Sequence, residues 1–303
     1  MKLATTSEDF DRFCDKYINR VKNVHEAGFK YIDLSLYTVR ENDELLVSDD
    51  WKNTAKEISE YAKRNNIKFV QSHAPDVNPL KGEDAYRNAI EKTVRAMEIC
   101  EYLNIPCSVI HPGWDEKASR DEWFERNYKF FKELFPVMEK TGVTLLHENT
   151  TNANMPWYFS KTGKDMREFS EYVNHPLFHS CWDTGHANIE GNQYNEIIEI
   201  GDDLRALHIN DNRGAQDEHI IPFMGTMNMD EVICALKAIN YKGYFTFESG
   251  STLRSAQYWL GNRKEFEGDN RLLNPPVELQ KELERFMYNV GVYILKSYDE
   301  YEE

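Results

Sequence analysis

The run Thr144-Leu145-Leu146-His147-Glu148 decides the fold, because short apolar segments of this kind recur along the whole chain and several end in a metal-capable residue. Such runs are typical of buried β-strands. Longer segments with helical periodicity separate them, for example 50–65 and 83–103. Eight strands are predicted in this way: Lys2–Thr5, Tyr31–Ser35, Lys68–His73, Ser108–His111, Thr144–Glu148, His179–Asp183, Ala206–Asp211 and Tyr244–Glu248.

The alternation of strands and helices indicates the fold class. Strands that alternate with helices pair in parallel through right-handed crossovers, and eight such units favour closure into a barrel over an open sheet. No glycine-rich phosphate loop follows the first strands, which weakens the open-sheet alternative. Because no stretch resembles a linker, residues 1–303 are predicted to form one domain, a single (β/α)8 TIM barrel.

Helix ends carry their own signals. Ser119 followed by Glu122 fits a capping box that opens a helix, and Gly28 and Gly142 each follow a helical pattern, where glycine favours a left-handed end. The clearest predicted helices are Asp9–Ala27, Asp50–Asn65, Glu83–Leu103 and Asp121–Lys140.

The segment 249–277, between the last strand and the last helix, is long for a loop of this fold. It carries Tyr258, Trp259, Arg263 and Phe266, and it leaves the barrel on the side where active sites are built. We expect a lid over the site or a contact in a homo-oligomer. The alternative is a surface excursion without a role.

The composition of the chain limits the classes of molecule that it is expected to bind. The formal net charge is -16, from 52 acidic and 36 basic residues, which argues against nucleic acid and favours small neutral or cationic substrates. The five cysteines form no regular framework, which indicates free thiols in a reducing compartment. No signal-peptide pattern and no apolar stretch of about 20 residues is present, so the expected location is cytoplasmic, without a membrane.

Metal-capable residues stand at or just after the ends of six consecutive predicted strands. Each alone is more often a capping or hydrogen-bonded structural residue, so the argument depends on their coincidence. In a closed barrel these strand ends converge on one rim, where crowded carboxylates require a cation to offset their charge. The ligand types suit a divalent metal ion, namely Mn²⁺, Mg²⁺, Co²⁺ or Zn²⁺. The residues are His73, His111, Glu148, Asp183 with His186, His208 with Asp217 and His219, and Glu248.

These strand ends resemble the xylose-isomerase-like barrel superfamily, which includes ketose 3-epimerases, hydroxypyruvate isomerases, inosose dehydratases and endonuclease IV-type repair enzymes. The resemblance runs from His73 to Glu248 and is most specific in Cys181–Gly191 and Leu207–Glu248. It implies a sugar isomerase or epimerase that binds a small carbohydrate, free or phosphorylated, and works through an enediolate.

The resemblance also implies residue roles. In the epimerase branch one metal ion is held by Glu, Asp, His and Glu, and the two glutamates exchange the proton as acid and base. The matching metal ligands are Glu148, Asp183, His208 and Glu248, with Glu148 and Glu248 also catalytic. The expected substrate contacts are His186, Arg213, His73 and Trp114, the last as an apolar wall against the sugar ring or, equally, as a packing residue.

Three alternatives remain open at this point. A dehydratase would use the same metal site on a sugar or inosose. An endonuclease IV-type enzyme would hold three zinc ions, and His73, His111, His186, Asp217 and His219 would then be additional ligands. A barrel that senses a sugar without turnover is the third, motivated only by the versatility of the fold.

Overall fold

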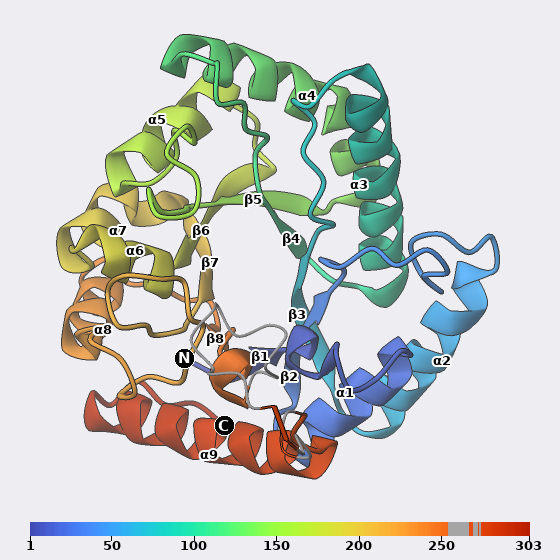
Figure 1. Cartoon of the computed structure of the whole chain (residues 1–303), viewed down its shortest axis with the longest axis vertical. Helices are drawn as coiled ribbons and strands as arrows, with labels where there is room; N and C mark the ends of the chain where they lie inside the picture. Colours follow the sequence, from blue (N-terminus) through green and yellow to red (C-terminus); the bar gives the residue numbers. More distant parts are fainter. Residues whose placement is uncertain (254–266, 269–271, 273) are drawn as a thin grey trace.

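A computed structural model describes residues 1–253, 267–268, 272 and 274–303. Its eight strands are all parallel and form a barrel with the helices on the outside, as Figure 1 shows, which confirms the predicted single (β/α)8 TIM barrel. The strands are β1 (Leu3–Thr6), β2 (Tyr31–Ser35), β3 (Lys68–His73), β4 (Cys107–Ile110), β5 (Thr144–Glu148), β6 (Phe178–Asp183), β7 (Leu204–His208) and β8 (Phe245–Phe247).

The sheet runs in the order β7-β6-β5-β4-β3-β2-β1-β8, so its two edges are β7 and β8. One parallel bridge between Ile209 and Phe247 joins these edges. The Ile209 N–H donates to the Thr246 carbonyl at 2.8 Å, and the Glu248 N–H donates to the Ile209 carbonyl at 3.0 Å. The barrel is therefore closed by two backbone hydrogen bonds next to Glu248.

The outer layer consists of α-helices and short 3₁₀ turns. The capping box of Ser119 and Glu122 is present, and Gly142 ends the same helix with φ at 70°, both as predicted. The helices are α1 (Tyr17–Glu26), α2 (Trp51–Arg64), α3 (Glu83–Leu103), α4 (Arg120–Thr141), α5 (Gly163–Val173), α6 (Thr184–Glu190), α7 (Tyr194–Ile200), α8 (Met229–Ala238) and α9 (Val277–Ser297), and the 3₁₀ turns are η1 (Ser7–Phe10), η2 (Gly201–Asp203) and η3 (Gly250–Leu253).

Two predicted boundaries were wrong. The helix expected over 9–27 is divided into η1 and α1, because the buried Arg20 side chain turns back to bond the Cys14 carbonyl at 2.9 Å between them. The seventh strand ends at His208 instead of Asp211, because Asp211 pairs antiparallel with Ile220 in the following loop. In the first case a side chain bonds the local backbone, and in the second the backbone of the strand end pairs with that of the loop.

Side-chain alternation separates two apolar regions. Val109, Leu146, Cys181 and Ala206 come from four adjacent strands and form a small cluster of their own. The larger core lies between the strands and the helices. Because side chains alternate along a strand, Glu148 follows Leu146, and Asp183 follows Cys181, on the inner face of the barrel. His147, on the outer face, is buried and bonds the Ser170 hydroxyl at 2.9 Å, as expected for a core residue.

The predicted lid or oligomer contact falls largely on residues outside the described part of the chain. None of the described helices is long and apolar enough to cross a membrane. The five cysteines are free thiols, as predicted.

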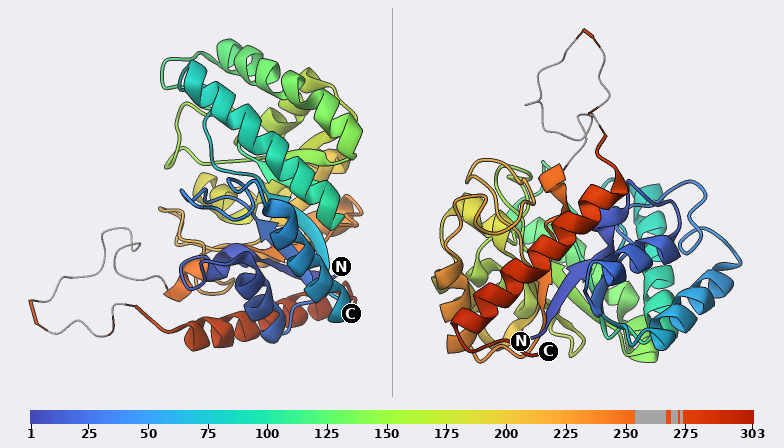
Figure 2. Two further views of the ribbon diagram at one scale, coloured as in Figure 1. Left: turned by 90° about the vertical axis from the view of Figure 1, so that its right-hand side faces the viewer. Right: turned by 90° about the horizontal axis from the view of Figure 1, so that it is seen from below.

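The last helix buries a carboxyl pair. Figure 2 shows α9 lying along the outside of the barrel. Its Glu284 side chain is fully buried, lies close enough to Asp9 for their charges to interact, and accepts a hydrogen bond from the Gln280 amide at 3.1 Å. Burial raises the pKa of Glu284 from 4.5 to about 7, and burial together with Glu284 raises the pKa of Asp9. The pair is therefore more stable with a proton than without one.

This pair makes the stability of the fold depend on pH. Because folding raises the pKa of Glu284, the folded state loses stability as the pH rises from about 4.5 through about 7. Between pH 5 and pH 8 the free energy of unfolding of the wild type is expected to fall by roughly 2–3 kcal/mol because of Glu284, and Glu284→Gln is expected to remove this part of the decrease. Urea unfolding at both pH values measures this, with the exposed Glu282→Gln as control. An equal pH dependence in the Glu284 variant and the wild type would contradict the assignment.

Candidate active site

The carboxyl ends of the strands surround a cavity of about 1170 Å³. Its lining contains eight of the predicted site residues: His73, His111, Trp114, Glu148, His186, Asp217, His219 and Glu248. Asp183 and His208 are fully buried and lie outside this lining, within reach of Glu148 and Glu248. The structure thus gathers residues from six strand ends at one rim, as the sequence predicted.

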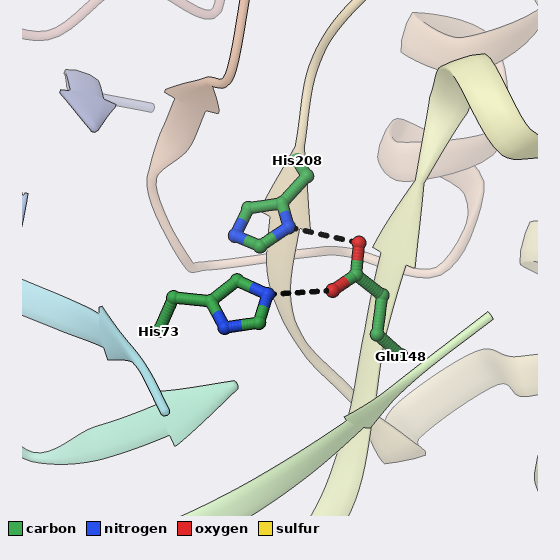
Figure 3. Close-up of side chains that lie close together, drawn as sticks. All are labelled: His73, Glu148 and His208. Carbon is green, nitrogen blue, oxygen red and sulfur yellow. Dashed lines mark hydrogen bonds and ion pairs between the residues drawn. The ribbon is translucent and has the colours of Figure 1, made fainter. Parts of the chain in front are cut away.

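Glu148 lies at the centre of the cluster, as Figure 3 shows. Its Oε1 is 2.9 Å from Nδ1 of His208, which comes from β7. Its Oε2 is 3.3 Å from Nε2 of His73 and 3.5 Å from Nε2 of His111. A carboxylate at the end of β5 therefore meets imidazoles from three other strand ends.

Glu148, Asp183, His208 and Glu248 form the group that the sequence predicted as metal ligands. One ligand atom from each lies within 4.8 Å of the others. His208 Nδ1 is 3.4 Å from Glu248 Oε2, in addition to its contact with Glu148. Two ligands of one divalent ion are at most about 4.4 Å apart, so only small side-chain shifts separate this arrangement from a coordination shell.

A second group adjoins the first. Asp183, His186 and His219 also offer ligand atoms within 4.8 Å of one another. Asp217 joins them, with its Oδ2 3.2 Å from His186 Nε2 and its Oδ1 3.0 Å from His219 Nε2. His219 Nδ1 is 3.4 Å from Glu248 Oε2, and Asp183 belongs to both groups, so the two groups are in direct contact.

Local sequence fixes Asp183 in place. It caps α6, accepting the His186 N–H at 2.6 Å with Oδ1, while Asn210 donates to Oδ2 at 2.6 Å. Asn149 brackets the Asp183 backbone, accepting from its N–H at 2.7 Å and donating to its carbonyl at 3.0 Å. A Cβ at position 185 would lie 1.7 Å from the Asn210 side-chain oxygen, so this approach requires Gly185.

The two glutamates have opposite electrostatic environments. Burial alone would raise the pKa of Glu148, but the His208 and His111 imidazoles outweigh it and hold the pKa well below 4.5. Burial raises the pKa of Glu248 to about 8, against the lowering effect of His208 and His219. Environments that separate the pKa values of two carboxyl groups are typical of acid–base pairs.

The donor set fits a divalent cation. Glu148 Oε2 and Asp217 Oδ1 are buried and accept no hydrogen bond of good geometry from the described residues, although imidazole nitrogens of His73 and His219 lie 3.3 and 3.0 Å away, and His111 Nδ1 is buried without a partner there. Buried polar atoms without partners are rare and need an explanation. Carboxylate oxygens and imidazole nitrogens are the ligands that Mn²⁺, Co²⁺ and Zn²⁺ take in proteins, and oxygen-rich sites accept Mg²⁺.

Trp114 and Arg213 were predicted as substrate contacts. Trp114 lines the cavity, packs on Trp157 with ring centroids 5.6 Å apart, and has the Lys81 ammonium 3.5 Å from its ring centroid. Arg213 is not part of the cavity lining in the described chain. Its side chain is 60% exposed and its guanidinium pairs with Glu218. The structure therefore brings Trp114 to the site and leaves Arg213 outside it.

Several cavity residues were missed from the sequence. Glu8, Tyr37 and Asp76 line the cavity, and the Ser35 hydroxyl donates to Glu8 at 2.8 Å. They follow β1, β2 and β3, and the first two of these strands were predicted to end without a metal-capable residue. Asp33 was missed as well; it is fully buried within β2 and lies 3.4 Å from His208 Nε2. A charged residue in an otherwise apolar strand was the signal that could have identified it.

Residues 21–269 match the family model of the xylose isomerase-like TIM barrel. The chain belongs to this family, which confirms the resemblance found in the sequence.

The individual relatives share less than 30% sequence identity with the chain over the matched residues. The chain is 29% identical over 206 residues to an uncharacterized protein of Methanocaldococcus jannaschii, covering 64% of this chain and 68% of that protein. It is 27% identical over 239 residues to the L-ribulose 3-epimerase of Methylomonas sp., covering 75% of this chain and 76% of the epimerase. A solved D-psicose 3-epimerase, in the presence of D-fructose, is similar with a TM-score of 0.75 at 17% identity, covering 97% and 99% of the two chains.

Proposed function

We propose that the chain is a metal-dependent isomerase or epimerase of a sugar or sugar phosphate, working by proton transfer through an enediolate. One observation carries the proposal. Glu148 and Glu248 come from strand ends on different sides of the barrel, and both face Nδ1 of His208, at 2.9 and 3.4 Å. The family and the relative named L-ribulose 3-epimerase support the same class of reaction.

Glu148, Asp183, His208 and Glu248 would hold the cation. A bound divalent ion would polarise the substrate carbonyl and the hydroxyl beside it. The chain's own carboxylates then do the proton chemistry: one removes the proton from the carbon next to the carbonyl, and the other returns it. Return to the opposite face of the same carbon gives an epimer, and return to the neighbouring carbon gives an aldose–ketose isomer.

Other cavity residues would orient the sugar. His186 and His73 line the cavity, and their Nε2 atoms, which face Asp217 and Glu148 at 3.2 and 3.3 Å, would bond substrate hydroxyls. Trp114 would provide an apolar surface for the C–H face of the ring. Arg213 can take part only if its pairing with Glu218 is broken, so we assign it no role.

Hydrogen exchange at carbon tests the proposal directly. The protein, supplied with Mn²⁺, is incubated in D₂O with a panel of free and phosphorylated ketoses and aldoses, and deuterium on carbon is measured by NMR. We expect incorporation into at least one sugar, with formation of its epimer or isomer. Loss of water from the substrate would instead identify a dehydratase. Absence of exchange with the whole panel would count against enediolate chemistry.

Phosphodiester cleavage is a second candidate because of the additional ligand groups. His73, Glu148 and His208 form one group, and Asp183, His186 and His219 form another, beside the predicted four. Metal analysis separates the candidates: three tightly held zinc ions per chain favour a nuclease, and one exchangeable ion favours the isomerase. Cleavage of an abasic DNA duplex would then decide for the nuclease.

A further inference from the structure

The interior of the barrel holds a carboxylate that the proposed reaction does not use. Asp33 lies on β2 and is fully buried. Its Oδ2 accepts a hydrogen bond from the Gln71 amide at 2.9 Å, and Gln71 in turn accepts one from the Thr246 hydroxyl at 3.1 Å. Its Oδ1 has no hydrogen-bond partner in the described chain. Burying a carboxylate with so few donors costs free energy unless it is paired or bonded further.

The nearest ring to Asp33 belongs to a proposed metal ligand. Asp33 Oδ2 is 3.4 Å from Nε2 of His208. The other ring nitrogen, Nδ1, faces Glu148 and Glu248. Nδ1 of His208 therefore faces the proposed cation site, and Nε2 faces the interior of the barrel.

We propose that Asp33 is a positioning residue for His208. Its carboxylate accepts the Nε2–H of the neutral imidazole, which places the lone pair on Nδ1 and aims it between Glu148 and Glu248. Ligating histidines commonly hold their second nitrogen against a carboxylate in this way, and such partners fix the tautomer and the ring orientation. The inference rests on the proposed function, because it requires a cation at Nδ1.

The chain around Asp33 supports this assignment. His208 is fully buried, and its ring stacks on that of His73 with centroids 5.5 Å apart and an interplanar angle of 15°. Stacking restricts the tilt of the ring but leaves its two nitrogens equivalent. Nε2 is buried and makes no hydrogen bond with the described residues, and Asp33 Oδ2, 3.4 Å away, is the acceptor whose small approach would distinguish it from Nδ1.

The test is cation affinity of the full chain after removal of bound metal. Titration with Mn²⁺ in a calorimeter is expected to show about 10–100-fold weaker binding by Asp33→Asn than by the wild type. Ser72→Ala is the matched control, because Ser72 is equally buried in the neighbouring strand and its hydroxyl lies 3.3 Å from that of Ser108, away from the proposed cation ligands. Circular dichroism checks that each variant is folded, and Asp33→Ser serves as a second variant if the first is not.

A spectroscopic readout separates positioning from a structural role. In the Zn²⁺-loaded wild type with ¹⁵N-labelled histidine, NMR is expected to show His208 protonated at Nε2 and bound through Nδ1. Coordination through Nε2, or binding by Asp33→Asn within twofold of the wild type, overturns the inference while the proposed function stands. A wild type that binds no cation but exchanges substrate protons also overturns it. No cation and no exchange overturn both.

Discussion

Glu248→Gln and Glu148→Gln are each expected to reduce carbon–proton exchange by a factor of about 10²–10⁴, the usual contribution of one acid–base group. The reason is that an amide cannot accept the substrate proton or return it. Glutamine still offers an oxygen, so part of the cation affinity is expected to remain. The measurement is the rate of deuterium incorporation, together with the metal content of each variant.

Two controls make this result specific. Asp183→Asn changes a proposed ligand that is not a proposed base, so its activity is expected to recover partly at high Mn²⁺, whereas that of the two glutamate variants is not. Glu133→Gln changes a carboxylate on α4, bonded to Tyr86 at the surface, and is expected to leave activity unchanged. Exchange at the wild-type rate in either glutamate variant would remove that residue from the proton-transfer step.

Removal of the cation has the second large expected effect. Chelation is expected to abolish activity and lower thermal stability, because four carboxylates would remain crowded at the rim, from Glu148, Asp183, Asp217 and Glu248. A ligand present at a thousandfold excess over its Kd stabilises the folded state by about 4 kcal/mol, which corresponds to a rise in Tm on the order of 5–10 °C. Scanning calorimetry of the chelated and the Mn²⁺-loaded chain measures the difference.

Re-addition of single metals then identifies the preferred ion. Activity that survives complete chelation, with an unchanged Tm, would contradict the metal-dependent mechanism. The Asp183→Asn variant is the control here, since its Tm is expected to respond less to Mn²⁺ than that of the wild type.

The sequence predicted most of the site because the fold makes strand ends meet. A residue at the carboxyl end of a parallel strand points to one rim regardless of loop conformation, so Glu148 and Asp183 could be placed together from periodicity. His208 was selected by the family resemblance, because the seventh strand was expected to continue to Asp211. Periodicity also placed His111 and Glu248, although each lies one residue beyond its strand in the structure.

Loop residues could not be placed in this way. Periodicity does not determine where a side chain points once a strand has ended, so Glu8 and Tyr37 were missed and Arg213 was expected at the substrate. Asp33 was missed for a different reason: its charge within a strand was visible in the sequence, but its contact with a ring from the seventh strand was not.

The joint between β7 and β8 has a consequence for binding. Every other neighbouring pair of strands shares at least two paired positions, whereas these two edges share the single Ile209–Phe247 bridge. Glu248 lies on one side of this joint, and Glu148, Asp183 and His208 lie on the other. A cation bound by all four would link the two edges of the sheet, so part of its binding free energy would stabilise the closure of the barrel.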